Sequence, residues 1–269
     1  MTEQIDGRIL ERLLPRAEES HKGSFGTLAM LCGCDCMPGA AYLAASGALR
    51  SGVGLLMAAA EGSLRTVLQT RLAEPVWISP DALPHPAQTA FLCGCGLGRT
   101  RDQLLKTLLP KISVPAVYDA DCINFFALHK DVLDGLSAPC VLTPHPMEFS
   151  RLTGLSVGEI QADREGLAAA FAQKHGCVLV LKGHRTVVAS PDGRVFINTS
   201  GCNALAKGGS GDVLAGVIAS LLAQGHSCLN AACIGVYVHG LAGERLAEKH
   251  GARGVLPSDL PMEIGRILG

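Results

Sequence analysis

The chain has 269 residues, of which 48% are hydrophobic and 17% are charged, and its formal net charge is −1. This composition supports a large core and excludes a predominantly disordered chain. The near-neutral charge, without a run of lysine and arginine, argues against a nucleic-acid or anionic-membrane partner bound by bulk electrostatics. No apolar stretch reaches the ~18 residues of a membrane span, and no secretion signal is found. We therefore expect a cytoplasmic protein.

Eleven cysteines raise the question of a metal or disulfide site. Their spacing contains no Cys-x-x-Cys pair and no Cys/His quartet typical of zinc, and an odd count suits a disulfide framework poorly. Most of them lie within apolar segments, such as residues 90–94. We predict reduced, mostly buried thiols.

Short apolar runs alternate with segments of helical period along the chain. The runs predict strands at 27–33, 53–60, 91–94, 115–121, 140–146, 177–183, 186–191 and 194–199. Helices are predicted at 40–52, 63–73, 102–112, 123–129, 163–175, 211–225, 229–251 and 258–268. Strands that are continuously apolar and joined by helices indicate an α/β fold, with a mainly parallel central sheet and helices on both faces. Because no linker or repeat interrupts the pattern, we predict one domain over 1–269, with 1–20 as an N-terminal extension or helix.

The strongest local signal is a glycine-rich turn, Gly208 to Gly211, which runs directly into a predicted helix. Backbone N–H groups at a helix start carry partial positive charge, and glycine lets a phosphate approach the backbone. Asp212 stands at the start of the same helix, where it can cap the helix or accept a proton from a substrate hydroxyl. The turn matches neither the P-loop nor the Rossmann pattern, so it indicates an anion site of another kind.

A series of motifs, found in order along the chain, resembles the NAD(P)H-hydrate dehydratase family of the ribokinase-like superfamily. The matching segments are 21–33, 38–56, 95–99, 119–124, 142–154, 180–188, 203–225 and 237–247. Their joint occurrence is far more specific than any one of them. The resemblance implies a ribokinase-like fold.

The same resemblance implies an enzyme that repairs NADH or NADPH whose nicotinamide ring has added water. In this family ADP, or ATP in the eukaryotic type, phosphorylates the ring hydroxyl of the (6S) hydrate, and elimination of phosphate restores the ring. For this chain we expect ADP to be converted to AMP and phosphate, with Mg²⁺ as cofactor. We also expect a homotetramer, and a separate epimerase protein as a possible partner because the chain has no epimerase segment.

The resemblance assigns site residues by position. Asp212 would be the base, and the residues expected to contact the hydrated substrate are Ala40, Gly96, His145 and Asp212. The residues expected to bind the nucleotide are Lys182, Gly183, His184, Arg185, Thr186, Gly209, Ser210 and Gly211. Glu148 would organise Mg²⁺ through water molecules.

Several of these residues also have a purely structural interpretation. Lys182 could be a solvated lysine in a tight turn, His145 a hydrogen-bonded loop residue, and Glu148 a carboxylate that complements a helix dipole. The segment 119–124 could orient a ribose or a metal-bound water, although strand-end turns favour Asp and Asn in any case. The chain departs from the family pattern at Cys95, where proline is usual, and this loop is expected to be less rigid.

Three other functions remain open at this point. One is the ATP-dependent form of the same reaction, and another is a ribokinase-like kinase for a hydroxyl-bearing vitamin precursor. Retention of a phosphorylated product would identify such a kinase. The third is a nucleotide-binding regulator without turnover, against which the presence of both Asp212 and Lys182 speaks.

Overall fold

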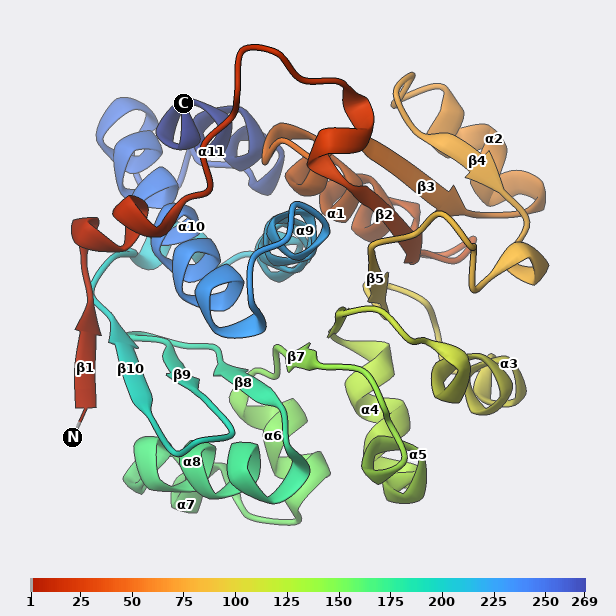
Figure 1. Ribbon diagram of the computed structural model, residues 1–269. Coiled ribbons are helices and arrows are strands. Elements are labelled where there is room, and N and C mark those ends of the chain that lie inside the picture. Colours follow the sequence, from red (N-terminus) through yellow and green to blue (C-terminus); the bar gives the residue numbers. More distant parts are fainter. Residues whose placement is uncertain (1) are drawn as a thin grey trace.

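The computed structural model describes residues 2–269, in which ten strands form one sheet (Figure 1). The strands are β1 (Thr2–Ile5), β2 (Thr27–Leu31), β3 (Leu55–Ala59), β4 (Val76–Ile78), β5 (Ala90–Cys93), β6 (Ala116–Tyr118), β7 (Cys140–Leu142), β8 (Val178–Leu181), β9 (Val187–Ala189) and β10 (Val195–Asn198). Their order across the sheet is β1-β10-β9-β8-β7-β6-β5-β2-β3-β4. The β8–β9 and β9–β10 pairs are antiparallel, whereas the other neighbours pair in parallel. The expected mainly parallel sheet is thereby confirmed.

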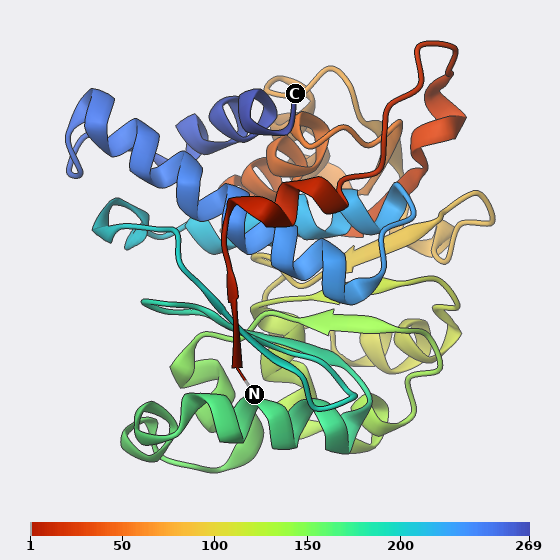
Figure 2. The same cartoon turned by 60° about the vertical axis from the view of Figure 1, so that its left-hand side comes forward.

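Two layers of helices enclose the sheet, as Figure 2 shows. The helices are α1 (Pro38–Arg50), α2 (Gly62–Gln69), α3 (Asp102–Leu108), α4 (Asp121–Leu128), α5 (Lys130–Asp134), α6 (Pro146–Thr153), α7 (Val157–Ala162), α8 (Arg164–His175), α9 (Ser210–Ala223), α10 (Cys228–His250) and α11 (Leu260–Leu268). One layer contains α1, α2, α9, α10 and α11, and the other contains α3 to α8. In the part of the chain that the structure describes, no helix combines the length and apolar character needed to span a membrane.

Side chains alternate between the two faces along each strand, which divides the core in two. In β2, Leu28 and Met30 pack with the layer of α1, α9 and α10, while Ala29 and Leu31 face the layer of α3 to α8. Both faces are buried, and this explains why the strands are continuously apolar in sequence. The eleven cysteines are free thiols, and most of them are buried in these two cores.

Helices α1 and α9 pack with their backbones in close approach. A Cβ atom on Gly216 would lie 2.0 Å from the carbonyl oxygen of Ala44, and one on Gly47 would lie 2.6 Å from that of Val213. Only glycine permits this separation. The packing brings the first turn of α1, which contains Ala40, beside the first turn of α9, which contains Asp212.

Two edge strands and three short helices were not predicted from the sequence. β1 pairs in parallel with β10, so the segment expected as an N-terminal extension contributes a strand to the sheet edge (Figure 2). β1 has three exposed residues of four, and β4 begins with the exposed Val76. Edge strands are partly solvated and therefore lack a continuous apolar run. Of the helices that were not predicted, α5 and α7 have five and six residues, too few for a clear helical period, and α6 has eight.

Candidate active site

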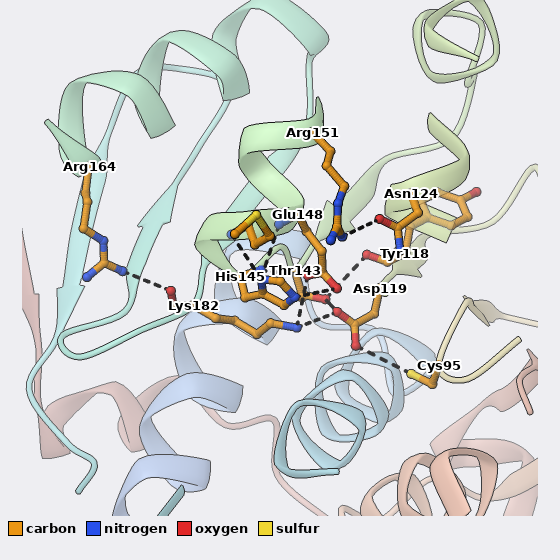
Figure 3. A network of polar contacts seen from close by, with 11 residues as sticks. Cys95, Tyr118, Asp119, Asn124, Thr143, His145, Glu148, Arg151, Arg164 and Lys182 are labelled. Atoms are coloured by element: carbon orange, nitrogen blue, oxygen red, sulfur yellow. Dashed lines mark hydrogen bonds and ion pairs between the residues drawn. The ribbon is translucent and has the colours of Figure 1, made fainter. Parts of the chain in front are cut away.

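The carboxyl ends of three neighbouring strands supply the centre of the candidate site. Asp119 follows β6, Thr143 follows β7 and Lys182 follows β8, and Figure 3 shows their side chains directed at one another. Ala120 has a φ of 48°, in the left-handed region, so the chain turns sharply between Asp119 and the start of α4. In open α/β sheets, ligands bind outside this edge of the strands.

Lys182 lies between two buried carboxylates. Its Nζ is 2.7 Å from Oδ1 of Asp119 and 3.9 Å from Oε2 of Glu148. The hydroxyl of Thr143 donates to the same Asp119 oxygen at 2.7 Å. Burial acts to lower the pKa of Lys182, but the charges of Asp119 and Glu148 outweigh it, and the pKa is raised overall. Lys182 is therefore a permanent cation, and not the solvated lysine of the structural interpretation.

Asp212 is the third residue of α9 and faces the same centre. One carboxylate oxygen of Asp212, one of Asp119 and the thiol of Cys95 all lie within 4.8 Å of one another. Burial is the main cause that raises the pKa of Asp212 to about 7, and the charge of Asp119 adds to it, whereas Lys182 acts in the opposite sense. A carboxyl with this pKa is partly ionised at neutral pH and can both accept and release a proton.

His145 and Glu148 cap the N-terminus of α6 together. Nδ1 of His145 accepts from the backbone N–H groups of Met147 and Glu148, at 3.1 and 3.3 Å. The Glu148 carboxylate accepts from the backbone N–H of His145 at 2.8 Å, and its Oε1 lies 3.2 Å from Nε2 of the His145 ring. Burial acts to raise the pKa of Glu148, but His145 and Lys182 lower it overall, so the group is ionised. Glu148 therefore has the structural role expected at the N-terminus of a helix, and the hydrogen bonds expected for His145 are those of an N-cap.

A cavity of about 510 Å³ opens beside this centre. Of the residues expected to bind a nucleotide, those that line it are Lys182, Gly183, His184, Arg185, Thr186, Ser210 and Gly211. Gly209 does not line it and forms the N-cap of α9, with a φ of 101° that favours glycine. Lining residues that the sequence did not single out are Asn198, Ser200, Gly201, Cys202, Asn203, Leu205, Ala206, Lys207, Leu214, His239 and Gly240.

His239 is a buried member of this lining that supports the start of α9. Its Nε2 lies 2.9 Å from the carbonyl oxygen of Ser210 and 3.1 Å from the hydroxyl of the same residue. Burial lowers the pKa of His239 to about 4, so the ring is neutral at pH 7. Because a carbonyl can only accept, Nε2 carries the proton and donates it to Ser210. No local motif could have shown this contact, since the two residues are 29 positions apart.

Ala40 and Gly96 lie against each other on another side of the centre. A Cβ on Gly96 would stand 2.5 Å from that of Ala40, and Gly96 has a φ of 59°. Gly96 follows Cys95, whose thiol donates to Asp119 at 3.7 Å. The loop that contains Cys95 therefore contacts Asp119 through the thiol and packs closely against α1 through Gly96.

These features define the class of the protein, an α/β fold of the ribokinase-like kind. A ribokinase-like superfamily protein from Enterococcus faecalis superposes with a TM-score of 0.88 at 28% identity, over 99% of this chain and 95% of that chain. The family model for NAD(P)H-hydrate dehydratase matches residues 28–266. The chain belongs to the NAD(P)H-hydrate dehydratase family, and the resemblance seen in its motifs is confirmed.

Similar proteins fall into two size classes. The ADP-dependent (S)-NAD(P)H-hydrate dehydratase of Neisseria meningitidis is 40% identical over 91% of this chain and 86% of its own length. A bifunctional NAD(P)H-hydrate repair enzyme of Moorella thermoacetica is 41% identical over 92% of this chain, which spans only 50% of that enzyme. The ADP/ATP-dependent NAD(P)H-hydrate dehydratase of Bacillus subtilis, co-crystallised with ATP/Mg²⁺, has a TM-score of 0.88 at 33% identity, over 99% of this chain and 97% of that chain.

Proposed function

We propose that the protein uses ADP to dehydrate the (S) hydrate of NADH and NADPH back to the usable cofactor. The observation that carries this proposal is the half-buried Asp212 carboxyl, with a pKa of about 7, at the start of a helix whose first residues line a nucleotide-sized cavity. The names of the Neisseria meningitidis and Bacillus subtilis relatives support the same reaction.

ADP would occupy the 510 Å³ cavity, with its β-phosphate at the start of α9. Ser210 and Gly211, the first two residues of α9, line this end, and the helix dipole favours an anion there. Lys182 supplies a positive charge at the boundary between the cavity and the carboxylates. The turn from Gly183 to Thr186 would hold the rest of the nucleotide.

The hydrated nicotinamide would lie against Ala40 and Gly96, with His145 as a polar contact. Asp212 takes the proton of the ring hydroxyl while the hydroxyl oxygen bonds to the β-phosphorus of ADP. The bond from that phosphorus to the AMP oxygen then breaks. Phosphate then leaves the ring carbon, assisted by the lone pair of the ring nitrogen, and the adjacent carbon loses a proton. Hydroxide is a poor leaving group, so the phosphorylation makes the elimination possible. The protein mainly positions the two reactants and accepts one proton.

The residues present fit a magnesium ion. Asp119 and Glu148 are buried, and Glu148 is held ionised beside the proposed phosphate position, an oxygen donor set that suits Mg²⁺ bound through water. Bound there, Mg²⁺ would neutralise charge on the transferred phosphate. Glu148, and Asp119 beside it, are the residues that would hold the ion.

Assembly and cellular context extend the proposal. We propose a cytoplasmic homotetramer with a separate epimerase as a possible partner; the Moorella thermoacetica relative is named bifunctional, and the matched region spans 50% of its length. Light scattering coupled to gel filtration measures the assembly, and a molar mass other than four times 28.0 kDa contradicts the tetramer.

The test follows the near-ultraviolet absorbance of NADH after purified hydrated NADH is mixed with the protein and Mg²⁺. ADP, ATP and no nucleotide are used in parallel, and chromatography identifies the spent nucleotide. Recovery of absorbance with formation of AMP from ADP supports the proposal, while recovery only with ATP reverses the donor. A stable phosphorylated product without recovered absorbance would identify a kinase instead.

A further inference from the structure

Arg164, the first residue of α8, lies beside the turn that follows β8. Its Nη1 donates to the carbonyl oxygen of His184 at 2.7 Å, and its Nη2 donates to those of Leu181 and Lys182 at 2.8 and 3.3 Å. The guanidinium packs against Gly183, on which a Cβ would stand 3.0 Å from Nη2. One side chain thus engages three carbonyl groups of a single turn. The function proposed above gives this arginine no part.

The position of Arg164 is unfavourable for helix α8 itself. A cation at the first residue of a helix is repelled by the positive end of the helix dipole. Within residues 2–269 no carboxylate pairs with Arg164, and its Nε is buried without a hydrogen-bond partner. Burial lowers the pKa of Arg164, although a guanidinium stays charged at neutral pH. Only the carbonyl contacts compensate for these unfavourable terms, so the arginine serves the turn and not its own helix.

The backbone of this turn requires an external support. Arg185 has a φ of 55°, in the left-handed region that disfavours residues other than glycine. The residues from Gly183 to Arg185 are exposed, so no core packing holds them. A strained conformation persists only where contacts from outside fix it, and Arg164 supplies such contacts to this turn.

The peptide units of the turn have two sides. In a trans peptide the C=O and N–H bonds point in opposite directions. The carbonyl groups of Lys182 and His184 point at Arg164, so the N–H groups of the same two units, those of Gly183 and Arg185, point away from it. In the described part of the chain, neither N–H donates to a protein group. Gly183, His184 and Arg185 line the 510 Å³ cavity whereas Arg164 does not, which places these free donors on the cavity side.

Arg164 also fixes the backbone from which the Lys182 side chain extends. The N–H of Lys182 donates to the carbonyl oxygen of Pro144 at 2.9 Å, while its own carbonyl and that of Leu181 accept from Arg164. Figure 3 shows Lys182 between Arg164, which contacts its carbonyl, and Asp119, which its ammonium reaches. The placement of the ammonium therefore depends on the arginine on the far side of the turn.

We propose that Arg164 is a positioning residue for the nucleotide. Its guanidinium holds the carbonyl side of the turn, so that the N–H groups of Gly183 and Arg185 donate to oxygen atoms of the nucleotide in the larger cavity. A cation at the carbonyl oxygens also polarises these peptide units and strengthens their N–H donors. This inference rests on the proposed function, which places ADP in that cavity. Arg164 itself contacts neither reactant.

The first test is isothermal titration with ADP in the absence of hydrate. Arg164→Met should raise the Kd for ADP about tenfold, because the turn loses three hydrogen bonds to a charged donor. Arg164→Lys keeps the charge, but one ammonium cannot replace the planar fork, so its Kd should lie between those of Arg164→Met and the wild type. Lys174→Met is the matched control, since it removes one positive charge from an exposed position of the same helix.

Kinetics separate positioning of the nucleotide from a general loss of structure. In Arg164→Met, KM for ADP should rise with the Kd, while KM for hydrated NADPH should equal that of the wild type. A purely structural role would lower the fraction of active protein and leave both KM values unchanged. Unchanged KM for ADP, or an equal rise in both KM values, overturns the inference.

Trypsin cleavage of the ligand-free protein distinguishes failure of this inference from failure of the proposed function. The turn contains two trypsin sites, after Lys182 and Arg185. Arg164→Met should be cut at these two sites several-fold faster than the wild type or Lys174→Met, with the fragments identified by mass.

Faster cleavage confined to the turn supports the contact of Arg164 with the turn even where the wild type fails to bind ADP, a result that would instead reject the proposed function. An unchanged cleavage rate overturns the inference. So does an ADP affinity equal to that of Lys174→Met, when the wild type binds ADP. If Arg164→Met does not fold, Arg164→Lys is subjected to the same comparisons, with smaller effects of the same sign expected.

Discussion

Lys182 and Asp119 form an ion pair of 2.7 Å that sets the electrostatic balance of the site, although 63 positions separate the two residues in sequence. Glu148 and Asp212 complete a group of three carboxylates around this one ammonium. Asp119 raises the pKa of Asp212, while Lys182 lowers it. The two members of the pair thus shift the pKa of Asp212, the proposed proton acceptor, in opposite directions, so removal of either one should change that pKa.

The pH dependence of turnover should therefore move in opposite directions in two variants. Lys182→Met removes a positive charge, so the pKa of Asp212 should rise above about 7 and the ascending limb of kcat against pH should shift to higher pH. Asp119→Asn removes a negative charge and should shift the limb to lower pH. Steady-state rates across a pH series measure both shifts. Lys174→Met, in the last turn of α8, serves as the control and should leave the limb unshifted. Shifts of the same sign in Lys182→Met and Asp119→Asn would contradict the assignment.

Asp212→Asn should lower kcat by about 10²-fold or more, because the proton acceptor is removed while the fold remains. The substitution should also stabilise the protein at high pH. The pKa of Asp212 is about 7 in the folded state and lies above the ordinary value of 3.8. Its ionisation therefore lowers the free energy of unfolding progressively between these two values, and the loss is complete above pH 7. Thermal denaturation should show a larger gain in Tm over the wild type at pH 8 than near pH 4. Normal turnover by this variant would show that another group is the base.

His239 should be required for nucleotide binding through its hydrogen bond to Ser210. His239→Ala removes the donor to the Ser210 carbonyl, so the Kd for ADP should rise and the free energy of unfolding should fall by about 1–3 kcal/mol. His239→Gln can donate from its amide and should retain more of both. Isothermal titration with ADP and thermal denaturation measure the two effects, and identical ADP affinity in wild type and His239→Ala would contradict them.

The same histidine should contribute to acid sensitivity. Its folded pKa of about 4 lies below the ordinary 6.5, so the unfolded state binds the proton more readily. The contribution of the neutral His239 ring to the free energy of unfolding is fully present above pH 6.5 and is lost as the pH falls toward 4. The drop in Tm between pH 7 and pH 4.5 should be smaller in His239→Gln than in the wild type. An unchanged or larger drop would show that other groups dominate acid unfolding.

The sequence predicted what local pattern determines. Continuous apolar runs predicted the buried parallel strands, and the glycine-rich turn predicted the start of α9. The strand expected at 115–121 ends earlier, at Tyr118, because α4 begins at Asp121. Pattern could not show which strand ends adjoin, so the pairing of Asp119 with Lys182 required the strand order. The contact of His239 with Ser210 likewise depends on how α10 crosses α9.

The packing of α1 against α9 was also beyond local pattern, although it joins Ala40 to Asp212 in space. Gly216→Ala tests it, since the added methyl group would meet the carbonyl oxygen of Ala44 at 2.0 Å. Overpacking of this kind should destabilise the protein by about 1–3 kcal/mol, despite the better helix propensity of alanine.

Gly158→Ala is the matched control, because Gly158 is exposed in α7 and its Cβ would meet only the Ser156 hydroxyl, at 3.9 Å. This variant should be neutral or more stable by up to about 1 kcal/mol. Chemical denaturation measures both free energies of unfolding. Separation of α1 from α9 would also displace Ala40 relative to Asp212, so KM for the hydrate should rise in Gly216→Ala and stay constant in Gly158→Ala. Equal stability of the two variants would mean that the backbones can separate freely, and that their contact does not fix the geometry of the site.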